Sequence, residues 1–348
     1  MNVIETYLQE TPAKMKEILE KSADLFSGIS GESFDRIIVT GSGTSFHAAQ
    51  QTLKYLDSLL PAEIIALYPF MITEKLFVKR TLLIGVSQGG TSVSTYKAMK
   101  LARENGAVTA SMCGANDVVI DEMADHILTV YCGEENAGAK TKGYYCTKLN
   151  LMLFALYMAR SQGRIPPAEF DGHMDRIVKA IDNYMTVYRQ SEEWVEKNHG
   201  DFLNTKEMRV IGTDDLYGDA LEGALKLLET MRMPAAGYEF EEFIHGIYNA
   251  VDEKSTLFIM DSGVEERVER LTNVLSEWTG NIYVIGRNVR DDGKNLRASI
   301  VDDDIFHTFN FLLPIQLICA KIPPLIGIDP AVPKDTKFHM KLGSKKFD

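Results

Sequence analysis

Small hydroxyl residues and glycines gather at the ends of two apolar runs in the first third of the chain. The segments are Val39-Thr-Gly-Ser-Gly-Thr-Ser45 and Gly85-Val-Ser-Gln-Gly-Gly-Thr-Ser92, and a helical pattern follows each one. A phosphate dianion needs several directed donors, which backbone N–H groups at a helix N-terminus and nearby hydroxyls supply. Glycine allows the backbone to approach the ligand closely. We therefore expect a phosphate site made by Ser42, Gly43, Thr44, Ser45, Ser87, Gln88, Gly89, Thr91 and Ser92.

Two other interpretations of these loops compete with phosphate binding. Serine and threonine at a strand–helix junction are often only helix N-caps. A dinucleotide-binding loop fits poorly because Gly41-Ser-Gly-Thr-Ser-Phe46 lacks the third glycine, and no GK[ST] sequence marks a nucleotide-binding P-loop. Two such loops after neighbouring strands favour ligand binding, because open α/β sheets bind ligands at the carboxyl ends of strands.

The elements that must position these loops alternate between strand and helix. Apolar runs predict strands at 36–40, 63–68, 81–86, 108–112 and 126–131, with helices at 4–27, after the first loop through residue 60, at 92–105 and at 143–160. A charged helix is expected over 170–198. The pattern then restarts, with strands at 208–213 and 255–260, which indicates a duplicated α/β unit with a parallel sheet covered on both faces.

The expected organisation is an N-terminal helix at 1–30, a phosphate-binding domain at 31–170 and a helical connector at 171–200. A second domain follows at 201–330, and a tail at 331–348. The second copy has Asp261-Ser-Gly-Val-Glu265 where the first has its second hydroxyl loop. We therefore expect the first copy to bind phosphate and the second to supply another function.

Composition narrows the function classes. The chain has 348 residues and a net charge of −12, which argues against a nucleic-acid partner because phosphate backbones are bound by basic surfaces. No apolar run reaches the roughly 18–20 residues of a membrane span, and the N-terminus has no signal-peptide pattern, so a cytoplasmic location is expected. The four cysteines lack metal-like spacing, so buried thiols, no metal and no cofactor are expected.

A second set of polar residues lies on one predicted helix. Glu222, Lys226 and Glu229 are spaced i, i+4 and i+7, so they share a helical face. From the residues alone, an exposed salt-bridged face is the better interpretation. The helix follows the strand at 208–213, however, and so begins at the ligand-binding edge of the second sheet.

Taken together, these motifs resemble the SIS (sugar isomerase) domain. Nearly the whole chain is similar to the double-SIS isomerase half of glucosamine-6-phosphate synthase. It is more similar still to the fructoselysine- and glucoselysine-6-phosphate deglycases. The segments that carry the resemblance are the two loops, Ala137-Gly-Ala-Lys-Thr-Lys-Gly-Tyr144, Leu221-Glu-Gly-Ala-Leu-Lys-Leu-Leu-Glu229, Gly237-Tyr-Glu-Phe-Glu-Glu-Phe-Ile-His-Gly246 and Pro333-Lys-Asp-Thr-Lys-Phe-His-Met-Lys-Leu342. The resemblance implies an α/β fold of two tandem SIS domains, each a three-layer α/β/α sandwich of the flavodoxin-like type.

The resemblance also implies roles for single residues. Glu229 would move a proton between C1 and C2 of a sugar phosphate, on the helix that also carries Glu222 and Lys226, and His245 would assist ring opening or act as the paired base. In these families the histidine is contributed across a dimer interface, so a homodimer is expected. Lys140 and Lys142 would pair with phosphate or a substrate carboxylate, with surface lysines as the alternative. A tail lysine, Lys337 or Lys341, competes for the Schiff-base position that the synthase uses.

The expected activity is a deglycase that releases an amine from an amine-linked sugar 6-phosphate. The alternatives are a ketose–aldose isomerase or deaminase of an amino-sugar 6-phosphate and a non-catalytic phosphosugar sensor. The sensor is disfavoured because only about 30 residues precede the first strand and the chain is acidic. The sequence lacks the glutaminase domain that begins the synthase, so we expect the chain to use water, ammonia or no nitrogen at all, and not to hydrolyse glutamine by itself.

Overall fold

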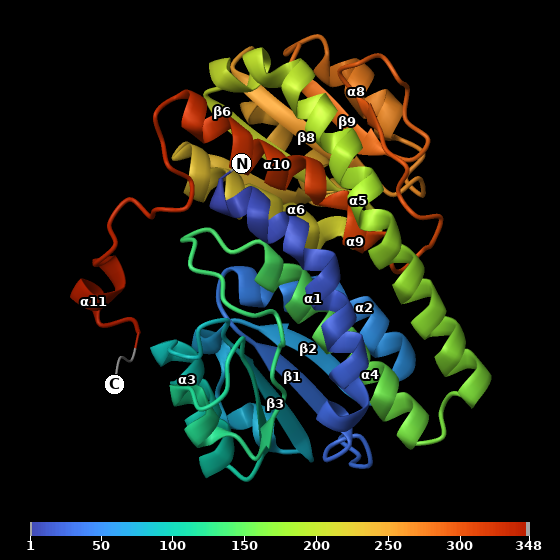
Figure 1. Ribbon diagram of the computed structural model, residues 1–348, viewed down its shortest axis with the longest axis vertical. Coiled ribbons are helices and arrows are strands. Elements are labelled where there is room, and N and C mark those ends of the chain that lie inside the picture. The colour runs from blue at the N-terminus through green and yellow to red at the C-terminus, as the bar shows by residue number, and fades with distance from the viewer. Residues whose placement is uncertain (1, 346–348) are drawn as a thin grey trace. The chain divides into compact units, whose positions relative to one another are not determined.

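A computed structural model describes residues 2–345, in two compact units (Figure 1). We call Glu10–Glu135, Lys142–Asp175 and Lys334–Asp348 the first unit, and Met1–Gln9, Asn136–Thr141 and Arg176–Pro333 the second unit. Two long helices contribute to both units. These are α1 (Val3–Phe26) and α5 (Pro167–Asn204), and the predicted connector at 171–200 lies within α5.

The first unit is built on a parallel five-stranded sheet with the order β2-β1-β3-β4-β5. Its strands are β1 (Arg36–Thr40), β2 (Glu63–Leu67), β3 (Thr81–Val86), β4 (Val108–Met112) and β5 (His126–Ile127). The predicted strand at 126–131 is too long. Beyond Ile127, the N–H groups of Leu128 and Val130 still donate to the carbonyls of Ser111 and Cys113, which lie in β4 and directly after it. The ladder therefore ends after two residues.

Helices cover both faces of the first sheet. On one face α3 (Val93–Glu104) packs Ala98, Met99 and Ala102 against Ile38 and Leu83, with η3 (Val119–Met123) beside it. The other helices are α2 (Thr44–Leu59) and α4 (Lys142–Ser161), which pack against each other. Short 3₁₀ turns η1 (Pro69–Met71) and η2 (Glu74–Phe77) connect β2 to β3. In the tail, α11 (Phe338–Leu342) is exposed.

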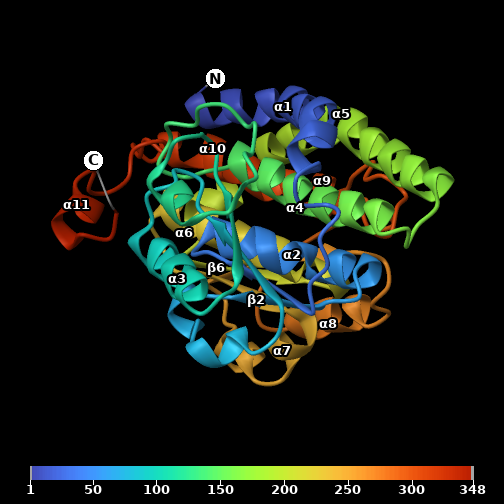
Figure 2. The same cartoon turned by 90° about the horizontal axis from the view of Figure 1, so that it is seen from below.

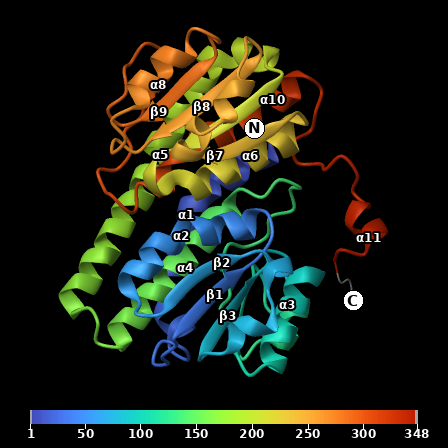
Figure 3. The same ribbon diagram turned by 180° about the vertical axis from the view of Figure 1, so that it is seen from behind.

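The second unit repeats this architecture. Its strands are β6 (Glu207–Gly212), β7 (Ala235–Glu239), β8 (Ser255–Asp261), β9 (Ile282–Gly286) and β10 (Leu296–Arg297). They form a parallel sheet with the order β10-β9-β8-β6-β7, which is the same winding as in the first unit. Figure 3 shows the strands of each sheet side by side. The predicted duplication and the predicted α/β class are therefore confirmed.

The second sheet is also covered on both faces. Phe240 and Phe243 of α7 (Phe240–Ile244) and Val268 and Leu275 of α8 (Val268–Leu275) pack on Ile211, Leu257, Ile259 and Val284. The remaining helices are α6 (Tyr217–Met231), preceded by η4 (Asp214–Leu216), and α9 (Thr308–Phe311) with α10 (Leu313–Leu325). A 3₁₀ turn, η5 (Ile247–Ala250), follows α7. Figure 2 shows α10 beside α1 and α5, where Lys321 pairs with Glu5 and Glu192.

Two expectations from composition can be compared with the structure. All four cysteines are free and buried, as predicted. One helical stretch in the described chain, Thr308–Leu325, has the length and apolar composition of a membrane span, but 83% of it is buried within the protein. This burial is typical of the core helix of a globular domain.

Candidate functional site

The two predicted phosphate loops begin at the same edge of the first sheet. Strands β1 and β3 are parallel neighbours, with Thr40 opposite Gly85, so the loops at 41–45 and 87–92 leave adjacent strand ends. The strand order β2-β1-β3 reverses direction between β1 and β3. Open α/β sheets bind ligands at such a switch point.

The first loop enters α2 without a side-chain cap. Gly43 takes the N-cap position with φ of 56°, a left-handed conformation that favours glycine, and makes no side-chain cap hydrogen bond. Ser42 is exposed, while Thr44 and Ser45 are half-buried. The N-terminal turn of a 16-residue helix therefore faces this loop, as an anion site requires.

The second loop has a structural role, because it caps the N-terminus of α3. Ser92 is the N-cap of α3, and its hydroxyl accepts a hydrogen bond from the N–H of Thr95 at 3.4 Å. The capping interpretation is thus realised for Ser92. Ser87 is nearly buried, and its carbonyl closes a tight turn with the N–H of Gly90. Gly89 is exposed at the tip of this turn.

Gln88 is held by residues that no sequence pattern connected to it. Its amide Nε2 donates to the Cys132 Sγ at 2.7 Å, and its Oε1 accepts a hydrogen bond from the Thr147 hydroxyl at 3.4 Å. A Cβ at Gly143 would lie 2.6 Å from the Gln88 Cδ, so glycine is needed where α4 begins. Cys132, Gly143 and Thr147 therefore fix the Gln88 side chain, and only the folded chain reveals them.

The two predicted lysines differ in their surroundings. Lys142 is 1% exposed, and its Nζ donates to the Glu10 carboxylate at 2.7 Å and to the Glu134 carbonyl at 2.9 Å. The carboxylate of Glu135 accepts hydrogen bonds from the N–H groups of Lys142 and Gly143, which caps α4. Lys142 therefore holds the start of α4 together, and it is not the surface lysine of the alternative interpretation. Lys140 is half-buried on the segment Asn136–Thr141 of the second unit.

On α6, the polar face predicted to be exposed is directed inward. The Glu222 and Lys226 side chains are 0% and 1% exposed, with the Lys226 Nζ 3.5 Å from the Glu222 carboxylate. The same Nζ lies 2.6 Å from the Glu229 carboxylate, whose side chain is 34% exposed. Leu228, an apolar residue of the same helix, is exposed instead. The exposed salt-bridged face is therefore wrong: a buried lysine holds a carboxylate at the protein surface.

His245 lies at the C-terminal end of α7 with 72% of its side chain exposed. Its Nδ1 is 2.7 Å from the backbone carbonyl of Glu241, and because a carbonyl only accepts, Nδ1 is the donor. The neutral ring then presents Nε2 as its basic nitrogen. In the described chain the hydrogen bonds and the ion pair of His245 are with Glu241 and Glu242, and none of them joins it to Glu229.

The tail reaches the second loop of the first unit. Lys345 forms an antiparallel bridge with Ser92, and the Ser344 carbonyl accepts a hydrogen bond from the N–H of Val93 at 3.3 Å. Of the two tail lysines, Lys341 pairs with Asp335 at 2.6 Å on the surface. The backbone N–H of Lys337 donates to the same Asp335 carboxylate. This docking of the tail was not predicted.

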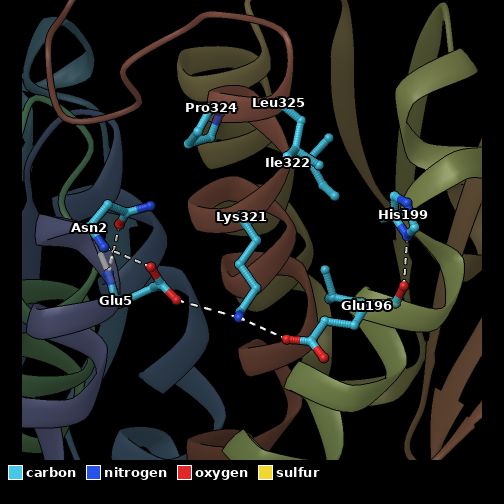
Figure 4. Close-up of a pocket in the computed structure, with 9 residues that line it drawn as sticks. Asn2, Glu5, Glu196, His199, Lys321, Ile322, Pro324 and Leu325 are labelled. Carbon is cyan, nitrogen blue, oxygen red and sulfur yellow. Dashed lines mark hydrogen bonds and ion pairs between the residues drawn. The ribbon is translucent and has the colours of Figure 1, made fainter.

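Two cavities of the second unit are lined by none of the predicted site residues. One, of about 610 Å³, surrounds Lys321, whose amine lies between Glu5 and Glu196 (Figure 4). The same amine also pairs with Glu192. Another, of about 690 Å³, lies between α8 and β9 and is lined by carboxylates, amides and hydroxyls. Among residues 2–345, no group of three or more His, Cys, Asp or Glu side chains could hold a metal ion.

Comparison with known proteins identifies relatives of this chain. A family model described as the SIS domain matches residues 32–157. Glutamine–fructose-6-phosphate aminotransferase (isomerizing) of Campylobacter jejuni is 28% identical over 316 residues, which are 86% of this chain and 50% of that protein. The chain spans about half the length of the curated relatives that it matches.

Solved structures extend the match over the whole chain. A candidate phosphosugar isomerase of Clostridium difficile 630 is 53% identical, covers 99% of both chains and has a TM-score of 0.97. A candidate sugar-binding protein of Salmonella typhimurium LT2 is 39% identical, covers 92% of this chain and 100% of its own, and has a TM-score of 0.86.

Proposed function

Because the chain belongs to the SIS-domain family and is related to the isomerase half of glutamine–fructose-6-phosphate aminotransferases, we propose that it is an enzyme acting on a sugar 6-phosphate. The hydroxyl loops after β1 and β3 bind the phosphate, through Ser42, Thr44 and Ser45 and the N–H groups that begin α2. Ser87 and Gln88 hold the sugar beside it. Lys140 is a further candidate for an anionic group of the substrate.

The observation that carries a catalytic role is the Lys226–Glu229 pair on α6. A carboxylate that is partly exposed and supported at 2.6 Å by a buried ammonium group can take up and return a proton without moving. We assign this proton transfer between C1 and C2 of the open-chain sugar to Glu229. Lys226 holds the carboxylate in place, and Glu222 balances the charge of Lys226 inside the helix packing.

We propose further that the reaction is a deglycation. In a ketoamine, the proton lost from C1 returns at C2 and the amine proton moves to the oxygen, which leaves an imine at C1. Water then adds to this imine carbon, the carbon–nitrogen bond breaks, and a free amine and a hexose 6-phosphate are released. His245, with Nε2 as its basic nitrogen, serves ring opening.

Charge around His245 supports an amine-bearing substrate. Three carboxylates lie within six residues of His245 in the sequence: Glu239, Glu241 and Glu242. One of them, Glu241, forms an ion pair with Arg267. A substrate ammonium group would be attracted to this negative region. The runner-up, an isomerase or deaminase of an amino-sugar 6-phosphate, uses the same proton transfer and is favoured by the relation to the aminotransferase isomerase half.

Product analysis separates these activities. We expect the protein to release lysine and a hexose 6-phosphate from fructoselysine 6-phosphate or glucoselysine 6-phosphate, measured by liquid chromatography with mass spectrometry. The Glu229→Gln variant should lose about 10²–10⁴-fold in kcat. The Glu266→Gln variant, which changes an exposed carboxylate on another segment, is the control. Turnover of glucosamine 6-phosphate alone would favour the runner-up, and full activity of Glu229→Gln would remove the proton-transfer assignment.

A homodimer completes the proposal, with His245 contributed to the partner's site. The exposure of His245 and the lack of a hydrogen bond or ion pair between it and Glu229 in the described chain support this arrangement. Light scattering after size exclusion should give twice the chain mass, and an active monomer would contradict it.

A further inference from the structure

We propose that His307 is a positioning residue for the proton-transfer helix α6, which it holds through Asp215 in the 3₁₀ turn η4 directly before the helix. This inference rests on the proposed function, in which Glu229 of α6 transfers the proton. All residues concerned belong to the second unit.

The start of α6 needs support from outside the helix. Its N-cap residue, Leu216, makes no side-chain cap hydrogen bond. Two residues earlier, Asp214 has φ of 50°, a left-handed conformation that is uncommon outside glycine and costs free energy. The chain thus enters the helix through a strained residue, and such a conformation persists only where surrounding contacts fix it.

Two side-chain pairs supply these contacts. The His307 Nε2 lies 3.0 Å from the Asp215 carboxylate, and both side chains are nearly buried. Since a carboxylate oxygen accepts, Nε2 is the donor. One turn further along, the Thr308 hydroxyl donates to the buried carboxylate of Asp219. The two donors are consecutive residues, so a single short segment holds both η4 and the first turn of α6.

The chain that follows His307 and Thr308 also contacts α6 further along the helix. Leu312 and Ile315 pack against Gly223, where a Cβ would lie 3.1 Å from the Leu312 side chain and 3.3 Å from Ile315. The Thr230 hydroxyl, near the far end, donates to the Lys226 carbonyl within the helix itself. Contacts at positions 215, 219 and 223 therefore run from the turn before α6 to the middle of the helix. Glu222 lies one residue before the contact at Gly223, and Glu229 lies six residues beyond that contact on the same helix.

Hydrogen bonds fix the helix along its axis in a way that apolar packing does not. Leu312 and Ile315 would tolerate small sliding of α6, whereas the directed pairs at its start lose their geometry within a few tenths of an ångström. A displacement of about 1 Å at a reacting group can cost about 100-fold in rate. The His307–Asp215 pair thereby sets where Glu229 presents its carboxylate.

The experiment compares four single variants and one double variant with the wild-type chain on the substrate identified by product analysis. His307→Leu removes the donor, and we expect kcat to fall about 10- to 100-fold. KM should stay within about threefold, because the phosphate loops lie in the first unit and do not depend on His307. His307→Gln restores an N–H donor at similar reach, and kcat should return to within about threefold of wild type.

A double-mutant cycle with Asp215→Ala tests the pair itself. If the two residues act through one hydrogen bond, the double variant should lose no more kcat than either single variant. Additive losses, or equal impairment of His307→Gln and His307→Leu, would overturn the proposal. Lys321→Met is the matched control, since it breaks ion pairs at the opposite end of α10 and should leave kcat and KM unchanged.

The outcomes also separate this inference from the proposed function. An inactive Glu229→Gln variant together with a fully active His307→Leu variant would reject only the role of His307. A fully active Glu229→Gln variant would reject the proposed function. Should His307→Leu fail to fold, judged by thermal unfolding, the comparison of His307→Gln with Asp215→Ala decides by the same criterion.

Discussion

The buried lysine on α6 determines how its two carboxylates can behave. Lys226 is 1% exposed and lies between Glu222, which is fully buried, and Glu229, which reaches the surface. Burial of a charge is tolerated when a partner of opposite sign stays in contact. The arrangement keeps Glu229 in one place, which a general acid–base group requires.

We predict that Lys226→Met lowers the free energy of unfolding by about 3–5 kcal/mol, because Glu222 is left buried without its cation on the same helix. Adding Glu222→Gln should recover more than half of this loss, since the double variant no longer buries that charge. Urea denaturation followed by circular dichroism measures both. A double variant as unstable as the single one would show that packing, not charge, explains the loss.

At the scale of elements, the two hydroxyl loops combine structural and binding tasks. Ser92 caps α3, while the helix after Gly43 begins without a side-chain cap. The same residue types therefore play different parts in two loops that leave adjacent strands. Stability and ligand affinity should respond separately to their removal.

Ser92→Ala should lower the free energy of unfolding by about 1 kcal/mol, because α3 loses its N-cap. Ser42→Ala should change it by less than about 0.5 kcal/mol, since Ser42 is exposed. Loss of a hydrogen bond to the charged phosphate should, however, raise KM at least about tenfold in Ser42→Ala.

Thermal unfolding and steady-state kinetics on both variants check this contrast. If Ser42→Ala leaves KM unchanged, the first loop does not bind the phosphate. If it destabilises the fold as much as Ser92→Ala does, its role is structural.

For the whole molecule, the proposed dimer makes a prediction that a monomer cannot satisfy. Glu229→Gln and His245→Ala should each be inactive alone. If His245 acts in the partner's site, subunit exchange between them should restore activity, because each mixed dimer contains one intact site. Random exchange gives about a quarter of wild-type activity. The two variants are mixed after a brief incubation at low concentration, and the recovered activity is measured, with each variant mixed with itself as the control. No recovery of activity would mean that Glu229 and His245 act within one chain.

Acid stability of the fold depends on a pair that holds the 303–306 turn. Burial raises the pKa of Asp303, but hydrogen bonds from the Arg176 guanidinium and from the N–H groups of Phe306 and Ile305 outweigh it, so its pKa lies below the usual value. A carboxyl whose pKa is lower in the folded state stabilises the fold above its unfolded pKa, and this contribution is lost as the pH falls through the folded pKa.

Wild type should therefore be more stable than Asp303→Asn at pH 7, and the difference should shrink as the pH falls below about 4. Urea midpoints between pH 7 and pH 3 measure the difference. A gap that is constant with pH would show that Asp303 acts without its charge.

The local pattern of apolar and polar residues was sufficient to predict most helices and strands, but it was not sufficient to predict which residues they contact. The strands at 81–86 and 108–112 could be predicted because buried parallel strands are short apolar runs bounded by polar residues. The strand at 126–131 could not be bounded, since His126 and Ile127 pair with β4 while the apolar residues after them leave the ladder. Strand ends depend on neighbours, which a run of apolar residues does not specify.

The sequence by itself determined the duplication, the two glycine–hydroxyl loops and the spacing of Glu222, Lys226 and Glu229, because each is a local periodicity or a run of residue types. Only the tertiary structure decided which side of α6 is buried, that Cys132 and Thr147 hold Gln88, and that His307 meets Asp215. These contacts join residues up to 92 positions apart. Such pairs form when helices and sheets pack, so their geometry is a property of the folded chain and not of any segment in it.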